Sequence, residues 1–128
     1  MQLRISADDG LPIYLQIVNQ VKYLIASGRL AAGEEIPAIR VLAQQLLVNP
    51  NTIARAYLEL EREGVVAKRH GAGTFISETA SPLARRERVK ILQERIDSLL
   101  VEARHLNVSF DELTSLLKQR RQTLHEHE

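Results

Sequence analysis

The sequence contains no cysteine and no tryptophan, and only 4% of its 128 residues are aromatic. The lack of cysteine excludes disulfides, thiolate metal sites and cysteine nucleophiles, and it fits a reducing cytoplasm. No apolar run approaches the roughly 20 residues that a membrane-spanning helix needs, and the N-terminus has no signal-peptide architecture. We therefore expect a soluble, cytoplasmic protein without a membrane partner.

The sequence also lacks a strong excess of charge of either sign. Its 17 Lys and Arg residues and 16 Asp and Glu residues give a formal net charge of +1. This balance excludes the polybasic footprint of a strongly basic nucleic-acid-binding domain, so any binding to DNA must depend on where a few cations are placed. The length and the 45% hydrophobic content allow one core with an appendage rather than two full domains.

Combinations of residues that enzymes need are absent as well. The sequence has no nucleophile paired with a base, no glycine-rich phosphate loop before a helix, and no set of side chains at a familiar metal-ligand spacing. Hence we expect no enzyme activity, no cofactor and no metal site.

Hydrophobic periodicity and helix-end signals predict the N-terminal elements. Apolar residues recur at steps of three and four along three segments, while Asn49-Pro50 and Gly64 mark the start and the end of the third helix. Two short β-type runs flank a glycine-rich tip, which predicts a hairpin. The expected elements are an edge strand over residues 2–6, helices over 12–27, 39–46 and 50–63, and hairpin strands over 65–68 and 74–77.

A different pattern follows Ser81-Pro82. Apolar residues then alternate at steps of three and four, as at the a and d positions of a coiled coil, and such a row needs a partner helix. After a break at Asn107, Ser109 and Glu112 have the spacing of a capping box that starts another helix. A second copy of the chain is the natural cover, although the break also permits an intramolecular helical hairpin. The expected dimerisation residues are Val89, Leu92, Ile96, Leu99, Ala103, Leu106, Leu113, Leu116 and Leu117.

These elements together predict an α+β, mainly α, fold. An N-terminal winged helix-turn-helix is expected over residues 1–78, followed by a two-helix dimerisation tail over residues 79–128. In a winged helix-turn-helix the third helix enters the major groove of DNA, and the hairpin, or wing, reaches the neighbouring groove or the backbone.

Four separated motifs resemble the DNA-binding domain of GntR-family regulators over about half of the chain. They are a Pro-x-Tyr-x-Gln-Ile opening from Pro12, a Pro-x-x-Arg-x-Leu-Ala element from Pro37, a Thr-x-x-x-Ala-Tyr element from Thr52, and a Gly-x-Gly-Thr-Phe wing from Gly71. Ala38 departs from the family, which usually has a serine there that could cap the second helix and touch a phosphate. The resemblance implies a transcriptional regulator that binds a double-stranded DNA operator.

The short C-terminal tail is similar to that of the YtrA-like subgroup of this family, which has two helices after the wing. This similarity implies a repressor that controls a neighbouring transporter operon. Because a dimer joined through the tail is twofold symmetric, we expect a homodimer that binds an inverted repeat. A tail of this size cannot enclose a pocket of roughly 300 Å³ by itself. Any small-molecule effector would therefore bind at a dimer interface or cleft.

The residues expected to contact DNA come from the second helix, the third helix and the wing. Arg40 offers paired donors to a phosphate or to a guanine edge, unless it pairs with Glu34 or Glu35. Arg55 lies on the exposed face of the third helix, where a surface pair with Glu59 is the alternative. The expected set is Arg40, Asn51, Thr52, Arg55, Lys68, Arg69, His70, Gly71 and Gly73.

Two interpretations without DNA binding also stay open. The cationic hairpin tip has the composition of an ordinary polar turn, and the whole chain could be a winged-helix protein-interaction module that has lost DNA binding. Arg40, Thr52, Arg55 and the cationic wing count against the second interpretation. Tyr57, Leu58 and Leu60 of the third helix are interpreted as core residues.

Overall fold

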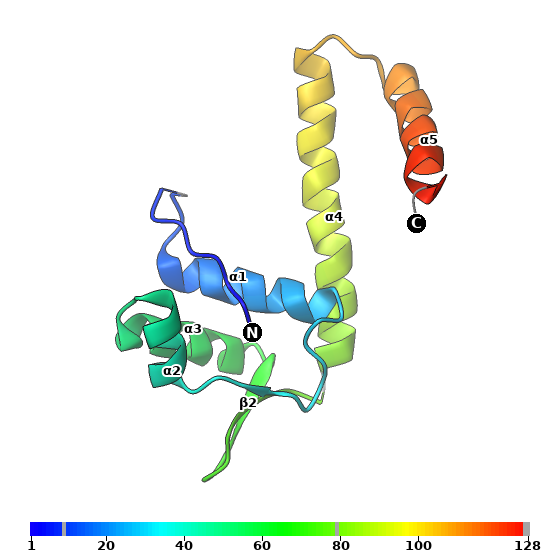
Figure 1. Cartoon of the computed structure of the whole chain (residues 1–128). Coiled ribbons are helices and arrows are strands. Elements are labelled where there is room, and N and C mark those ends of the chain that lie inside the picture. The colour runs from blue at the N-terminus through cyan, green and yellow to red at the C-terminus, as the bar shows by residue number, and fades with distance from the viewer. Residues whose placement is uncertain (9, 79, 127–128) are drawn as a thin grey trace. The chain divides into compact units, whose positions relative to one another are not determined.

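The computed structural model describes residues 1–8, 10–78 and 80–126, and it confirms the expected fold class. The chain is mainly helical, with one small antiparallel sheet in its N-terminal part (Figure 1). No helix within these ranges is apolar over enough residues to cross a membrane. The elements are α1 (Ile13–Ala26), β1 (Glu35–Ile36), α2 (Ile39–Leu46), α3 (Pro50–Arg62), β2 (Val66–Arg69), β3 (Gly73–Ile76), α4 (Ala80–His105) and α5 (Phe110–Glu126).

The chain divides into two compact units. The first covers Met1–Val89, and the second begins at Lys90, inside α4. In the first unit α1 and α2 both pack against α3. Because apolar side chains recur at helical spacing, each of these helices buries one face. The fully buried residues include Ile17, Val21, Leu42, Ile53, Leu60 and Ile76.

Local signals fix both ends of α3, as the sequence predicts. The Asn49 side chain accepts a hydrogen bond of 2.8 Å from the Asn51 amide, and Pro50 occupies the first helical position. This bond satisfies one of the amides that a helix start leaves without a partner. Gly64 follows the other end with a φ of 75°.

The turn between α2 and α3 contains a strained residue. Leu47 has φ 56° and ψ 44°, which lie in the left-handed region. A side chain with a Cβ is disfavoured there by roughly 1 to 2 kcal/mol. The Leu47 side chain is 91% exposed, so burial does not compensate for this cost.

We expect Leu47→Gly to stabilise the protein by about 1 kcal/mol, because glycine adopts this conformation without a steric cost. Denaturant unfolding followed by circular dichroism measures the change in the free energy of unfolding. Asn107→Gly is the matched control: Asn107 also has a positive φ, of 58°, but asparagine tolerates this region and the gain should be smaller. A Leu47→Gly protein less stable than the wild type would show that the leucine supports the turn.

The sheet has three antiparallel strands in the order β1-β3-β2. The sequence pattern does not predict β1, because this strand has only two residues and depends on a partner far along the chain. Its pairing is extended by two backbone hydrogen bonds of 2.8 Å. One runs from the Gly33 amide to the Ile76 carbonyl, and the other from the Ile76 amide to the Glu34 carbonyl.

The predicted edge strand over residues 2–6 is wrong, because glutamine side chains of α1 bind the backbone of this segment instead. Buried Gln16 accepts a hydrogen bond of 2.9 Å from the Ser6 amide and donates one of 2.8 Å to the Ser6 carbonyl. Gln20 accepts one of 2.8 Å from the Arg4 amide and donates to the Arg4 carbonyl. Loose alternation of apolar residues does not distinguish such side-chain partners from a neighbouring strand.

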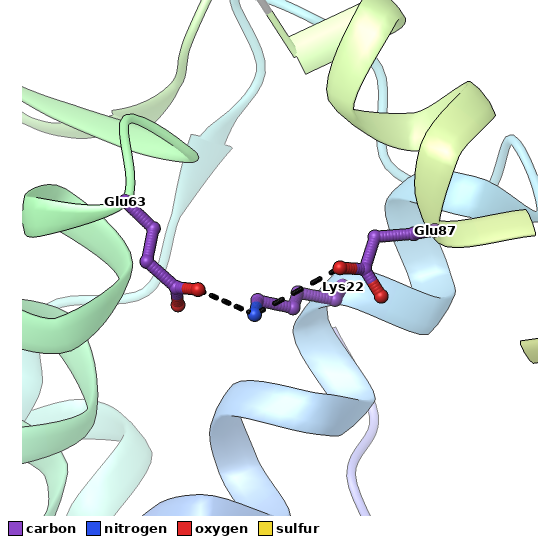
Figure 2. A network of polar contacts seen from close by, with 3 residues as sticks. All are labelled: Lys22, Glu63 and Glu87. Carbon is purple, nitrogen blue, oxygen red and sulfur yellow. Dashed lines mark hydrogen bonds and ion pairs between the residues drawn. The ribbon is translucent and has the colours of Figure 1, made fainter. Parts of the chain in front are cut away.

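An ion network joins α1, the end of α3 and the first part of α4 (Figure 2). Lys22 Nζ lies 2.8 Å from Glu63 Oε1 and 3.9 Å from Glu87 Oε1. The Lys22 side chain is only 15% exposed, and a cation so far removed from water needs charged partners. Within the first unit, the network thus connects the beginning of α4 to α1 and to the end of α3.

The second unit consists of the rest of α4 and of α5, and the chain reverses direction between them (Figure 1). Asn107 has a positive φ, and Ser109 Oγ accepts a hydrogen bond of 3.2 Å from the Glu112 amide, which confirms the predicted break and helix start. Within the predicted dimerisation set only Ala103 and Leu113 are buried. The exposed members are Val89, Leu92, Ile96, Leu99, Leu106, Leu116 and Leu117.

Candidate nucleic-acid interface

α3 presents one face to solvent and buries the other. Asn51, Arg55 and Arg62 are exposed and lie on one side of the helix, because the steps between them are four and seven residues. Thr52 is half-buried next to this face. Asn51, Thr52 and Arg55 therefore occupy the first two turns of α3, where a recognition helix presents side chains to base edges. The buried face consists of Ile53, Ala56, Tyr57 and Leu60.

Leu58 is not a core residue, contrary to the expectation from the sequence. Its side chain is 45% exposed. It follows Arg55 by three residues and precedes Arg62 by four, which places it on the solvent face of α3. The pattern is misleading here because the neighbours Tyr57 and Leu60 do belong to the core. A leucine on this face has the chemistry to contact a thymine methyl group in the major groove.

Arg55 stacks on an aromatic ring. Its guanidinium carbon lies 3.8 Å from the centroid of the Tyr14 ring, which belongs to the first turn of α1. This geometry is that of a cation–π contact. No ion pair between Arg55 and Glu59 is present in the described part of the chain.

Arg40 lies in the first turn of α2 with an exposed side chain. Among the described residues it forms no ion pair with Glu34 or Glu35. A hydrogen bond of 2.7 Å from the Tyr57 hydroxyl to the Pro37 carbonyl fixes the start of α2 to α3. Burial raises the pKa of Tyr57 above its usual value, so the hydroxyl stays protonated and donates.

The residue before α2 is Ala38, and no side chain caps this helix. The missing serine hydroxyl noted in the sequence therefore has no substitute at the N-cap position. Arg40, two residues after Ala38, is then the polar side chain in the first turn of α2 that can bind a phosphate.

The wing is the hairpin of β2 and β3, which projects away from the three helices (Figure 1). Gly73 has a φ of 123°, a backbone conformation that residues with a side chain rarely adopt, so this position favours glycine. The predicted contact residues of the wing are Lys68 and Arg69 at the end of β2, His70 and Gly71 in the tip, and Gly73 at the start of β3.

Both cations of the wing have carboxylate neighbours. Lys68 Nζ lies 3.8 Å from Glu61 Oε2, and Arg69 Nη2 lies 3.9 Å from Glu78 Oε1. Arg69 also lies over the Phe75 ring, 4.3 Å from its centroid. The cationic side chains are 62% and 55% exposed, and ion pairs of such exposed groups stabilise a protein little. DNA phosphates can therefore replace these carboxylates at low cost.

Lys68→Ala combined with Arg69→Ala should weaken binding to all DNA sequences, because phosphate contacts carry no sequence information. The slope of log affinity against log salt should become shallower by up to about 0.9 for each phosphate contact that is lost. Fluorescence anisotropy titrations at several salt concentrations measure this slope. Glu61→Gln is the control, since it removes a competing carboxylate and should not weaken binding. An unchanged slope in the double variant would mean that the wing does not touch phosphates.

The sequence predicts no functional role for Tyr14, Glu61 or Glu78. Tyr14 belongs to the first of the four motifs, and that membership is the one signal that marks it in the sequence. No signal marks the two glutamates, because their proximity to the wing cations depends on where β2 lies relative to the last turns of α3 and to the segment after β3.

The fold and this surface define a winged helix-turn-helix regulator. The model of bacterial regulatory proteins of the gntR family matches residues 13–76, from the start of α1 to the end of β3. The chain belongs to this family.

Relatives extend the similarity beyond the winged domain. The HTH-type transcriptional repressor YtrA of Bacillus subtilis (strain 168) is 34% identical over 117 residues, which are 91% of this chain and 90% of that protein. A crystal structure of a transcriptional regulator from Oenococcus oeni matches with a TM-score of 0.75 and 28% identity, covering 90% of this chain and 95% of that one. The structure of AraR(DBD) in complex with operator ORX1 matches with a TM-score of 0.54 and 27% identity, covering 60% and 99%.

Proposed function

We propose that this protein is a cytoplasmic repressor that binds an inverted-repeat operator as a homodimer. The observation that carries the proposal is the solvent face of α3, where Asn51 and Arg55 occupy the first turns while the opposite face is fixed in the core. The similarity to a family member in complex with its operator supports this role for α3. The similarity to YtrA, which is named as a transcriptional repressor, supports repression rather than activation.

Sequence recognition is assigned to the first two turns of α3 in the major groove. The guanidinium of Arg55 offers two donors to O6 and N7 of guanine, and Asn51 can bind adenine through its amide. Thr52 donates to a base edge or to a phosphate. Arg40, from the first turn of α2, binds a phosphate and fixes the register of α3 on the duplex.

The wing adds affinity that does not depend on sequence. Lys68 and Arg69 bind phosphates and release counterions, and His70 extends from the tip. Gly71 and Gly73 have no side chain, so the backbone of the tip can approach the duplex closely.

The tail joins two copies of the chain. Ile96 and Leu99 are 52% and 38% exposed, and they belong to a row of apolar residues at coiled-coil spacing. Covering such a row by the same row of a second copy removes apolar surface from water, which contributes about 25 cal/mol per Å². Twofold symmetry then places two recognition helices on successive faces of the duplex. The operator should be an inverted repeat whose half-sites are one helical turn, or a multiple of it, apart.

We also propose control of a neighbouring transporter operon and of the protein's own gene, which is what the resemblance to the YtrA-like subgroup implies. Any effector would act at the interface of the two tails, because a ligand there changes the spacing of the two recognition helices. A change of spacing alters the affinity for an operator of fixed geometry.

Selection of random DNA fragments by the purified full chain tests the proposal. We expect an enriched inverted repeat with half-sites in register with the helical turn. Mutation of either half-site should then weaken binding in an anisotropy titration. Enrichment of a single, unpaired half-site would contradict the dimeric mode, and the absence of any enriched sequence would contradict specific recognition.

A further inference from the structure

Tyr14 connects the core of the first unit to the exposed face of α3. The residue lies in the first turn of α1, is half-buried, and packs against the hydrophobic core. On its other side the ring meets the guanidinium of Arg55 at 3.8 Å. An exposed, flexible arginine on a candidate recognition surface is thus in contact with a ring that the core holds in place.

The stack constrains Arg55 without occupying its donors. A guanidinium that lies on a ring uses its flat face, whereas its N–H groups point outward in the plane. Guanine offers its two acceptors, O6 and N7, to a pair of donors in one plane. The ring therefore orients the guanidinium for a bidentate contact and reduces the rotational freedom that binding would otherwise remove.

We propose that Tyr14 is a positioning residue that orients Arg55 and thereby determines discrimination for guanine in the operator. The inference rests on the proposed function, since it concerns how the base contact of Arg55 is prepared. The active feature is the aromatic face of Tyr14, because the contact is to the ring and not to the hydroxyl. A flat ring without the hydroxyl should therefore serve as well, and an aliphatic side chain should not.

The test compares Tyr14→Phe, Tyr14→Leu, Arg55→Ala and the double variant Tyr14→Leu with Arg55→Ala. Affinities are measured for the selected operator, for operators in which each guanine is replaced in turn, and for a shuffled duplex. Tyr14→Leu should lower operator affinity about fivefold, the order expected from loss of a cation–π contact. The loss should disappear on the operator that lacks the guanine read by Arg55. Affinity for the shuffled duplex and the salt slope should not change, because the charge of Arg55 remains.

Two further results are expected. Tyr14→Phe should keep the discrimination of the wild type, and Tyr14→Leu should have no additional effect in the absence of the Arg55 guanidinium. Tyr23→Leu, on the same helix, is the matched control and should leave discrimination unchanged.

Because Tyr14 packs against the core, circular dichroism is used to check that the Tyr14→Leu variant is folded. Arg55→Lys, which keeps the charge and loses the planar group without altering the core, should lose at least as much discrimination, because the bidentate contact itself is removed.

Side-chain NMR of the DNA-free protein tests the contact between Tyr14 and Arg55 independently of DNA binding. The Arg55 side-chain protons should show an upfield ring-current shift in the wild type and in Tyr14→Phe, and this shift should vanish in Tyr14→Leu. If Arg55→Ala weakens operator binding while Tyr14→Leu keeps full discrimination, the positioning role is overturned and base contact by Arg55 stands. If Arg55→Ala changes nothing, the base contact itself is overturned. Equal losses in Tyr14→Phe and Tyr14→Leu would assign the effect to the hydroxyl and overturn the stacking role.

Discussion

Replacing Ile96 and Leu99 by glutamate should convert the protein into a folded monomer whose affinity for the operator is about 10² to 10⁴ lower. Ile96 is 52% exposed and Leu99 is 38% exposed in the single chain, so the substitution removes only part of the packing of each side chain and the tail helices should still form. In the dimer the same charges would meet across an apolar seam, and burying unpaired carboxylates costs several kcal/mol. Each winged domain would then lose the effective concentration that its tethered neighbour provides.

Analytical ultracentrifugation gives the mass in solution, and anisotropy with duplexes of one or two half-sites gives the affinity. The double variant should bind both duplexes with the same weak affinity, whereas the wild type should prefer two half-sites. Ser98→Glu is the control, since Ser98 is exposed and lies outside the apolar row. A wild-type protein that stays monomeric at micromolar concentration, both free and on its operator, would rule out the tail as a dimerisation arm.

Arg55→Ala should weaken specific binding by about 1 to 3 kcal/mol, the discrimination that a good bidentate contact to a base provides. The loss should be confined to operators with the correct guanine, and the far-ultraviolet circular dichroism should not change, because Arg55 is exposed on a helix and alanine favours helix. Gel-shift or anisotropy titrations measure the effect. Arg29→Ala removes the same charge from an exposed site outside α2, α3 and the wing, and it should change operator affinity much less. An Arg55→Ala protein with wild-type operator affinity would contradict the assignment.

The helices and their ends are the part of the fold that local chemistry determines. Asn49-Pro50, Gly64, Asn107 and Ser109 all act within a few residues, so the sequence shows where α3 and α5 begin and where α3 and α4 end. β1 and the segment before α1 depend on distant partners. The two-residue strand exists because β3 pairs with it, and the first residues are held by Gln16 and Gln20 instead of a strand. No local pattern distinguishes these arrangements.

For the candidate site, the sequence predicts which residues belong to the site better than it predicts which groups those residues contact. Arg40 follows from a motif, whereas Arg55 and the wing cations follow from their positions on the third helix and in the hairpin. The partner that the sequence suggests for Arg55 is Glu59, one turn away on the same helix. The actual contact is Tyr14, brought there by the packing of α1 on α3. Leu58 shows the same limit, because an apolar residue beside core residues is assigned to the core until the orientation of the helix is known.

The dependence of DNA affinity on salt is the most direct test of the central claim that α3 and the wing bind a specific operator. It is measured with the wild-type chain on the selected operator and on a shuffled duplex of equal length. Log affinity should fall linearly with log salt by about 0.9 for each phosphate contact, and the operator should be preferred by about 10³ or more. Equal affinity for both duplexes together with a flat salt dependence would contradict the claim and would favour the alternative that the winged domain is a protein-interaction module.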